Sequence, residues 1–110
     1  MAKSASGGVP IVLQSAATTG NGTAIAIPSS FRQHTLYIIG SAGVSSGAVQ
    51  PQIASNPVDG SWADIGGGPI TVLDNDTVVY SWTGQVNAVR CPVSTTVVDG
   101  TVTVTYVGIP

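Results

Sequence analysis

The chain has 110 residues, of which 43% are hydrophobic, enough for one folded domain with a modest core. Only 7% are charged, against about 25% in an ordinary soluble domain, and the net charge is −2. Three basic residues cannot form a patch for a nucleic-acid backbone, and no stretch reaches the ~20 apolar residues that span a membrane. We therefore expect neither nucleic acid nor a membrane as partner. A surface with so little charge suggests a subunit covered by its neighbours.

The N-terminal residues 1–8 are small, and we expect them to form a flexible arm before a single domain over 9–110. The apolar segment Val9-Pro10-Ile11-Val12-Leu13 follows the arm, and it is too short for the apolar region of a secretory signal. This segment can form the first strand of its own sheet. Alternatively, it can be donated to the sheet edge of a neighbouring subunit.

Turn residues recur every eight to twelve residues, which is the spacing of an all-β sandwich or barrel. The apolar residues are mainly Val, Ile and Ala, Leu is rare and Glu is absent, so strands are favoured over helices. We predict one antiparallel β-sandwich or jelly-roll-like barrel of about eight strands with essentially no helix. The candidate strands lie near 10–14, 23–27, 34–39, 47–54, 61–65, 69–73, 77–82, 86–93 and 101–107.

Three of these segments indicate which side chains are buried. In 101–107 apolar residues alternate with Thr, and in 77–82 the residues in phase with Trp82 are apolar or aromatic, so these sets should face the core. The segment 34–39 is apolar on both faces, and we expect that strand to be central or covered.

The few residues that could carry chemistry are scattered. His34 and Cys91 are the only His and Cys, so a four-ligand zinc site is excluded. Asp74-Asn75-Asp76 resembles part of a calcium loop, but it lacks the twelve-residue frame and the terminal Glu, and we interpret it as a hairpin turn. We expect no metal and no cofactor.

Catalysis would require His34 to act as a base toward a serine or Cys91, together with an orienting carboxylate and an oxyanion site. The Gly-x-Ser-x-Gly spacing occurs at 43–47, but it lies in a stretch of turn residues with no helix expected after it. His34 opens the most apolar strand, so we interpret it as structural or interfacial, and Cys91 as a small buried hydrophobe. We predict no catalytic residues and a protein that is not an enzyme.

Trp62 and Arg90 have two interpretations each. Trp62 follows a turn, where it could be exposed as a stacking platform for a sugar or could pack between the sheets. Arg90 lies among apolar residues, and a lone buried charge is costly. We expect its guanidinium to reach a carboxylate such as Asp64 or the carbonyls of a neighbouring chain.

Three segments of the second half resemble, in the same order, small β-sandwich proteins of tailed bacteriophage particles. They are Ser-Asn-Pro-Val-Asp-Gly-Ser-Trp-Ala-Asp-Ile at 55–65, Gly-Gln-Val-Asn-Ala-Val-Arg at 84–90, and Asp-Gly-Thr-Val-Thr-Val-Thr-Tyr-Val-Gly at 99–108. The resemblance covers roughly 47–108 and departs from the pattern at the Pro57-Val58 insertion before Asp59-Gly60. Such proteins include head decoration (cement) proteins and tail or fibre modules.

The resemblance implies a non-enzymatic structural protein of the virion. We expect a decoration protein on the capsid surface that binds the major capsid protein as a homo-oligomer, a trimer, and stabilises the shell. The alternative is a tail or fibre module that binds a carbohydrate or a receptor, and binding through Trp62 would distinguish the two. The expected contact residues are Val9, Pro10, Ile11, Val12, Leu13, Val44, Trp62, Gly67 and Pro69.

Overall fold

The computed structural model describes residues 3–58 and 61–110, and this part of the chain contains strands and no helix. The prediction of an all-β fold is therefore confirmed. In chain order the strands are β1 (Lys3–Ser4), β2 (Ile11–Ala17), β3 (Ile25–Ala26), β4 (Gln33–Gly40), β5 (Ser46–Val49), β6 (Gln52–Ala54), β7 (Ala63–Asp64), β8 (Ile70–Thr71), β9 (Thr77–Thr83), β10 (Ala88–Arg90), β11 (Val93–Val98) and β12 (Val102–Ile109).

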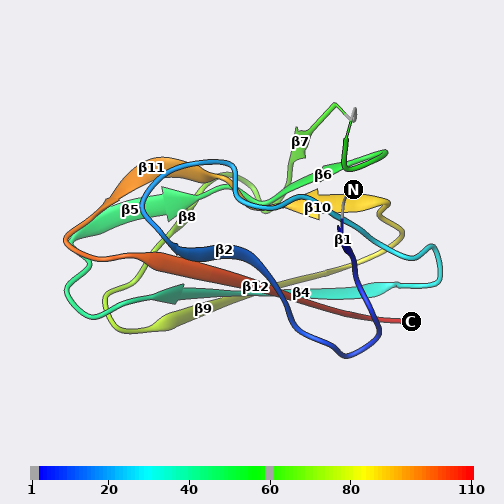
Figure 1. Ribbon diagram of the computed structural model, residues 1–110, viewed down its shortest axis with the longest axis horizontal. Coiled ribbons are helices and arrows are strands. Elements are labelled where there is room, and N and C mark those ends of the chain that lie inside the picture. Colours follow the sequence, from blue (N-terminus) through cyan, green and yellow to red (C-terminus); the bar gives the residue numbers. More distant parts are fainter. Residues whose placement is uncertain (1–2, 59–60) are drawn as a thin grey trace.

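The strands form three sheets in two layers (Figure 1). One layer is the four-stranded sheet β2-β12-β4-β9, which is antiparallel throughout. The other layer holds the three-stranded sheet β11-β5-β8 and, beside it, the five-stranded sheet β1-β3-β10-β6-β7. The arrangement is a β-sandwich, in which apolar residues of both layers meet in one core.

Two of the expected strands are each divided by a proline. The segment 47–54 becomes β5 and β6, which belong to different sheets and are separated at Pro51. The segment 86–93 is divided in the same way at Pro92, into β10 and β11. Proline has no N–H to donate to a strand ladder, so the chain changes sheet at both points. The sequence pattern also missed the extent of β11, because its central residues 94–96 are Ser-Thr-Thr and lack apolar alternation.

The core follows the predicted alternation. Val102, Val104 and Tyr106 of β12 have no exposed surface, while the Thr residues between them are partly exposed. Trp82 and the residues in phase with it on β9 pack against the same core, as predicted. Leu36 and Ile38 of β4 are also fully buried. Burial of these side chains provides the main stabilisation of the layers.

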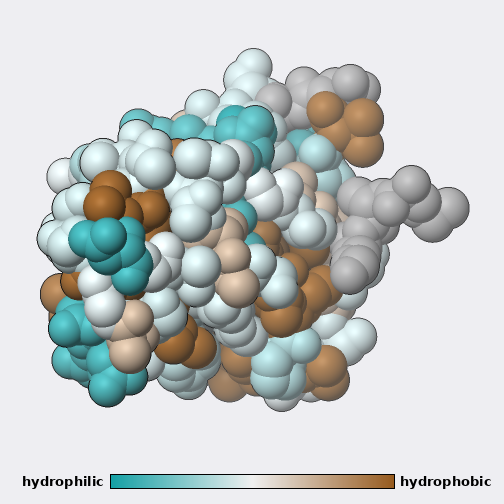
Figure 2. All heavy atoms as spheres, turned by 60° about the vertical axis from the view of Figure 1, so that its left-hand side comes forward, coloured by the Kyte–Doolittle hydropathy of each residue, from teal (hydrophilic) through white to brown (hydrophobic). Residues whose placement is uncertain are grey.

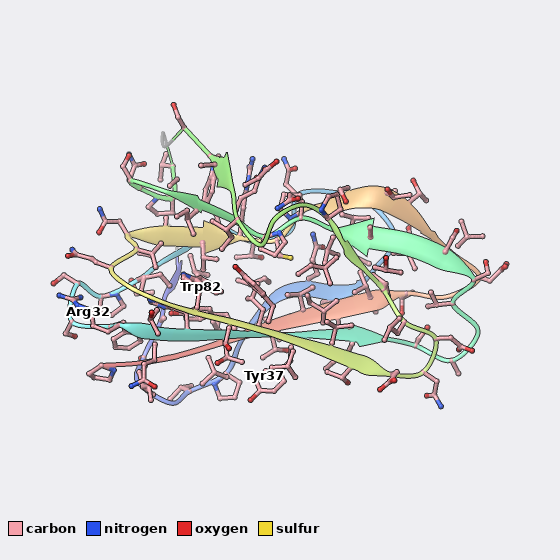
Figure 3. The ribbon with its side chains drawn as sticks, turned by 180° about the vertical axis from the view of Figure 1, so that it is seen from behind. Arg32, Tyr37 and Trp82 are labelled. Atoms are coloured by element: carbon pink, nitrogen blue, oxygen red, sulfur yellow. The ribbon has the colours of Figure 1, made fainter. Side chains whose placement is uncertain are left out.

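The strand β4 is central in its sheet, as predicted, but only one of its faces is covered. It pairs with β12 on one side and β9 on the other. Its inward side chains are buried, whereas Tyr37 and Ile39 on the opposite face are each 39% exposed. Figure 3 shows Tyr37 and Trp82 on opposite sides of this sheet, with Trp82 directed between the layers. Within the described residues of a single chain, no further layer covers the outer side of β4.

The N-terminal segment lies against the sandwich over its described part. Strand β1 pairs with β3, the N–H of Ala5 donates to the carbonyl of Ala26, and Ala5 is 6% exposed. Gly8 donates to the carbonyl of Gly108 near the C-terminus. Residues 1–2 lie outside the described residues, and the mobility expected of 1–8 stays a prediction. Strand β2, which contains most of the apolar segment, pairs with β12 of the same chain.

The triplet at 74–76 forms a turn between β8 and β9, but not the expected hairpin, because these two strands belong to different sheets and do not pair with each other. Asn75 has a φ of 49°, a left-handed conformation that Asn tolerates. The carboxylate of Asp74 accepts a hydrogen bond of 2.7 Å from the N–H of Gly43, which ties this turn to the loop after β4. No helix in the described part of the chain is long and apolar enough to cross a membrane.

We expect the stability of the fold to decrease in alkaline solution. Burial raises the pKa of the Cys91 thiol from 9.0 to about 12, and that of the Tyr106 hydroxyl from 10.0 to about 12. The unfolded chain therefore releases these protons at lower pH than the folded chain. The free energy of unfolding should be highest below about pH 9 and decrease as the pH rises toward about 12. Urea titrations over this range measure the decrease.

The variant Cys91→Ala separates the two contributions. Without the thiol, the free energy of unfolding should decrease less steeply between pH 9 and pH 12 than in the wild type. Equal slopes in the two proteins would contradict a contribution from Cys91. The absolute stability of the variant is lower because a buried side chain is truncated, so the comparison rests on the slopes.

Candidate functional site

The outer face of the four-stranded sheet carries no charge. The outer face comprises the side chains of this sheet that point away from the other layer. On β4, β9 and β12 they are Gln33, Thr35, Tyr37, Ile39, Thr77, Val79, Ser81, Thr83, Thr103, Thr105, Val107 and Ile109, and β2 adds Val12. Hydroxyls, one amide and apolar groups make up this face.

Register brings three exposed apolar residues of the outer face, Val12, Tyr37 and Val79, into one row with Thr105. Thr105 is opposite Val12 on β2 and Tyr37 on β4, and Tyr37 is opposite Val79 on β9. Val12 is 44% exposed and Val79 is 57% exposed. The side of the molecule seen in Figure 2 is mostly white or pale, with separated brown and teal patches, as a Ser-, Thr- and Gly-rich surface should be. The row on the outer face is mainly apolar, and the face around it has no charged side chain.

A second feature lies on the other layer, where Gln52 and Trp62 both contact the side chain of Arg90. Arg90 is half-buried at the end of β10, after the fully buried Ala88 and Val89. Nε of Arg90 donates to Oε1 of Gln52 at 2.8 Å, and Nε2 of Gln52 donates to Oδ1 of Asp64 at 2.8 Å. The guanidinium carbon of Arg90 lies 4.4 Å from the centre of the Trp62 ring, a cation–π contact.

These contacts revise two expectations from the sequence. Arg90 reaches Asp64 through the amide of Gln52 rather than directly. Trp62 is half-buried and is not part of the hydrophobic core, so it does not pack between the sheets. One face of its ring instead supports the guanidinium of Arg90.

Arg90 borders a cleft of about 380 Å³ where the two sheets of this layer meet. Six of the nine lining residues are polar or charged, and the lining comes from five separate parts of the chain. Its residues are Asn21, Gln50, Gln52, Asp64, Gly68, Pro69, Arg90, Pro92 and Ser94. A cleft of this size lies within the range of small-molecule sites.

The amide of Gln50 is fixed at one wall of the cleft. Gln50 is 6% exposed, and its Nε2 donates to the carbonyls of Pro51 and Ile65, both at 2.8 Å. These two donations use both amide hydrogens and fix which end of the amide is nitrogen. The oxygen Oε1 is therefore held as an acceptor.

His34 belongs to a buried polar cluster inside the sandwich. Its Nε2 lies 2.7 Å from the carbonyl of Gly84 and its Nδ1 lies 2.6 Å from the hydroxyl of Tyr106. A carbonyl can only accept, so Nε2 carries the proton and Nδ1 accepts from Tyr106. The His34 ring stacks on Trp82 with 5.0 Å between ring centres. His34 is 1% exposed and contacts no carboxylate in these interactions, which supports its interpretation as structural.

The structure separates the nine expected contact residues into three groups. Leu13 and Val44 are core residues, at 1% and 7% exposed, and have almost no surface to offer a partner. Trp62, Gly67 and Pro69 lie near the cleft, and Pro69 lines it. The remaining four, Val9, Pro10, Ile11 and Val12, lie at or before β2, where Val9 and Val12 are exposed.

Several residues of these two surfaces were not expected from the sequence. Gln50 and Gln52 flank a proline at a strand break, and that Gln-Pro-Gln pattern is the only local signal of their position. Tyr37 and Val79 were predicted to lie in strands, but their exposure on one row depends on the register of three strands. Among the described residues, no three His, Cys, Asp or Glu side chains group together to hold a metal ion.

The fold is similar to that of a solved structure. The SPBc2 prophage-derived protein YomS superposes with a TM-score of 0.67, is 15% identical, and the match covers 91% of this chain and 91% of that chain. The sequence matches no protein-family model and no curated protein. At this identity the likeness shows the fold alone, and the chain shares its sandwich architecture with a prophage-derived protein.

Proposed function

We propose that this protein is a non-enzymatic structural component of a bacteriophage particle and that it decorates the capsid, binding the major capsid protein through the outer face. The uncharged outer face carries the proposal. This face exposes four apolar or aromatic side chains, those of Val12, Tyr37, Ile39 and Val79. Their contact with water is unfavourable, and a flat protein surface could bury them. Because the face contains no charge, contact with a shell would leave no ion buried without a partner.

An edge of the same sheet supports self-association. Strand β9 ends the sheet and, within the described chain, pairs with β4 alone. Its seven residues contain neither charge nor proline, the devices that usually protect an exposed edge. A second copy could add to this edge by strand pairing, so a homo-oligomer, with the expected trimer as its state, is part of the proposal.

The likeness of fold to a prophage-derived protein agrees with a phage origin for the function. A decoration protein needs shape and adhesion rather than chemistry, and the chain's only histidine is occupied by two internal hydrogen bonds. The protein would stabilise the shell by binding the assembled lattice and not its dissociated subunits.

A reconstitution experiment tests this function. Particles of the encoding phage are stripped of the protein, the purified chain is added back, and binding is measured by sedimentation and shell disruption by calorimetry. We expect saturable binding and a higher disruption temperature. Confirmed binding with an unchanged disruption temperature would reject stabilisation, and the absence of binding to the shell would reject decoration.

The variant Val79→Arg tests the outer face. The substitution would place an unpaired charge in the apolar row, and we expect affinity for the particle to fall about 30-fold. Thr96→Arg on β11, which is exposed on the opposite layer, is the matched control and should bind as the wild type does. Both changes are on the surface and should leave the unfolding temperature nearly unchanged. Equal loss in the two variants would place the docking surface elsewhere.

A further inference from the structure

We infer that the cleft beside Arg90 is a binding site for an acidic saccharide, a sugar that carries a carboxylate as a uronic or sialic acid does. The guanidinium of Arg90 would donate hydrogen bonds to the carboxylate of the sugar. The amide and carboxylate oxygens of the lining would accept hydrogen bonds from the sugar hydroxyls. This site goes beyond decoration of a shell and does not depend on it. The cleft lies on the layer opposite the outer face, so a docked protein would leave it open.

Arg90 is already fixed in place by its neighbours. Its Nε is occupied by Gln52, and its planar face lies over Trp62. The two terminal nitrogens make no hydrogen bond to the described residues. They form the end of the guanidinium that pairs with a carboxylate through two parallel hydrogen bonds. Because Gln52 and Trp62 already immobilise the side chain, little conformational entropy is lost on binding.

Gln50 offers the cleft a fixed acceptor. Its oxygen Oε1 accepts from no described residue, although the residue is only 6% exposed. Among the described residues the one enclosed side-chain polar atom without a partner is Nε1 of Trp82, so Oε1 of Gln50 is not sealed from the cleft. An accessible amide oxygen held in a fixed position can accept a hydrogen bond from a donor that enters the cleft. A ligand hydroxyl is such a donor.

The charge balance of the cleft selects the class of ligand. The lining holds one cation, Arg90, and one carboxylate, Asp64, whose Oδ1 already accepts from Gln52. A phosphate would bring a charge near −2 to a neutral site. A sugar carboxylate brings a single charge, and its many hydroxyls match the amides and hydroxyls of Asn21, Gln50 and Ser94. An acidic saccharide therefore fits the cleft better than a phosphate does.

The test is a titration of the whole chain with a matched pair of glycans, sialyllactose and lactose, with digalacturonate as a second acidic probe and inorganic phosphate as a third arm. The signal is the indole N–H resonance of Trp62, with that of Trp82 as an internal reference. We expect a saturable shift of Trp62 with the acidic glycans, and at least tenfold weaker binding of lactose and of phosphate. The Trp82 resonance should stay in place.

Variants assign the binding to Arg90. Arg90→Gln should weaken binding of the acidic glycans at least tenfold, and Arg32→Gln, at an exposed arginine outside the cleft, should leave it unchanged. Arg90→Lys keeps the charge but cannot donate two parallel hydrogen bonds to a carboxylate, and this variant should also bind the acidic glycans more weakly. If Arg90→Gln does not fold, the Arg90→Lys variant and the wild-type resonances still decide the result.

Three outcomes would overturn the inference: an unmoved Trp62 resonance with both acidic glycans, equal affinity for lactose and sialyllactose, or equal affinity for phosphate and the acidic glycans. The second would remove the role of the carboxylate, and the third would make the cleft a general anion site. Failure here is distinct from failure of shell binding, because Arg90→Gln should bind the particle as the wild type does.

Discussion

Replacing Gly40 with alanine is expected to lower the free energy of unfolding by about 3 kcal/mol. Gly40 ends β4, where its N–H donates to the carbonyl of Asp76 at 2.9 Å. An added Cβ would lie 2.8 Å from the carbonyl carbon of Leu73 and still closer to its oxygen. Both are backbone atoms, so no side-chain rotation relieves the overlap. Either β4 or the turn after β8 would have to move, and their packing would be lost.

Substitutions at two other glycines are controls that separate the effect of this overlap from the general effect of replacing glycine with alanine. Gly67 has a φ of +74° and no atom within 4 Å of an added Cβ, so Gly67→Ala should cost only the ~1 kcal/mol of left-handed strain. Gly7 meets no atom closer than 3.8 Å and has an ordinary φ, so Gly7→Ala should be nearly neutral. Urea unfolding of the three variants gives the order. A Gly40→Ala variant as stable as Gly67→Ala would mean that the turn yields without loss.

Replacing His34 with alanine is expected to lower the free energy of unfolding by about 3–5 kcal/mol. The change removes a fully buried ring that stacks on Trp82. It also leaves the hydroxyl of Tyr106 and the carbonyl of Gly84 without their partner. The loss of packing and the unpaired Tyr106 hydroxyl act together, because His34 and Tyr106 are both buried and hydrogen-bond to each other. Thermal and urea unfolding measure the loss.

The variants His34→Phe and Tyr106→Phe separate the contributions of ring packing and hydrogen bonding to this loss of stability. His34→Phe keeps a ring on Trp82 but leaves both polar neighbours unpaired, and should cost about 2–4 kcal/mol. Tyr106→Phe removes a single hydroxyl and should cost about 1–2 kcal/mol. If His34→Phe were as stable as the wild type, the hydrogen bonds of His34 would contribute nothing to the fold. Retention of particle binding by folded Tyr106→Phe would agree with the structural role proposed for this cluster.

The sequence predicted the strands well wherever periodicity or a turn residue marked them. Alternation in β9 and β12 predicted which side chains are buried, because successive residues of a strand point to opposite faces whatever the strand pairs with. Predictions were less accurate at prolines. The sequence of 47–54 is apolar enough for one strand, and only the assembled sheets show that Pro51 separates two strands in different sheets.

The outer face and the cleft beside Arg90 could be predicted only in part from the sequence. The double-sided apolar pattern of 34–39 predicted a central strand, and the structure places β4 there. A covered strand was the other alternative for this pattern, and no layer of the described chain lies on the outer face, so Tyr37 remains exposed. Trp62 and Arg90 were singled out separately. That they form one stacked pair beside Gln52 depends on the pairing of β6 with β7 and β10.

By itself, the sequence determined the all-β class, the scarcity of charge, the turn positions and the buried face of the most regular strands, since these depend on composition and on the two-residue period of a strand. Only the tertiary structure decided which residues share a surface. Register across strands far apart in the chain aligned Val12 with Tyr37 and Val79 and brought Arg90 to Gln52. A one-residue shift of register would turn each of these side chains to the other face, and no local pattern specifies that alignment.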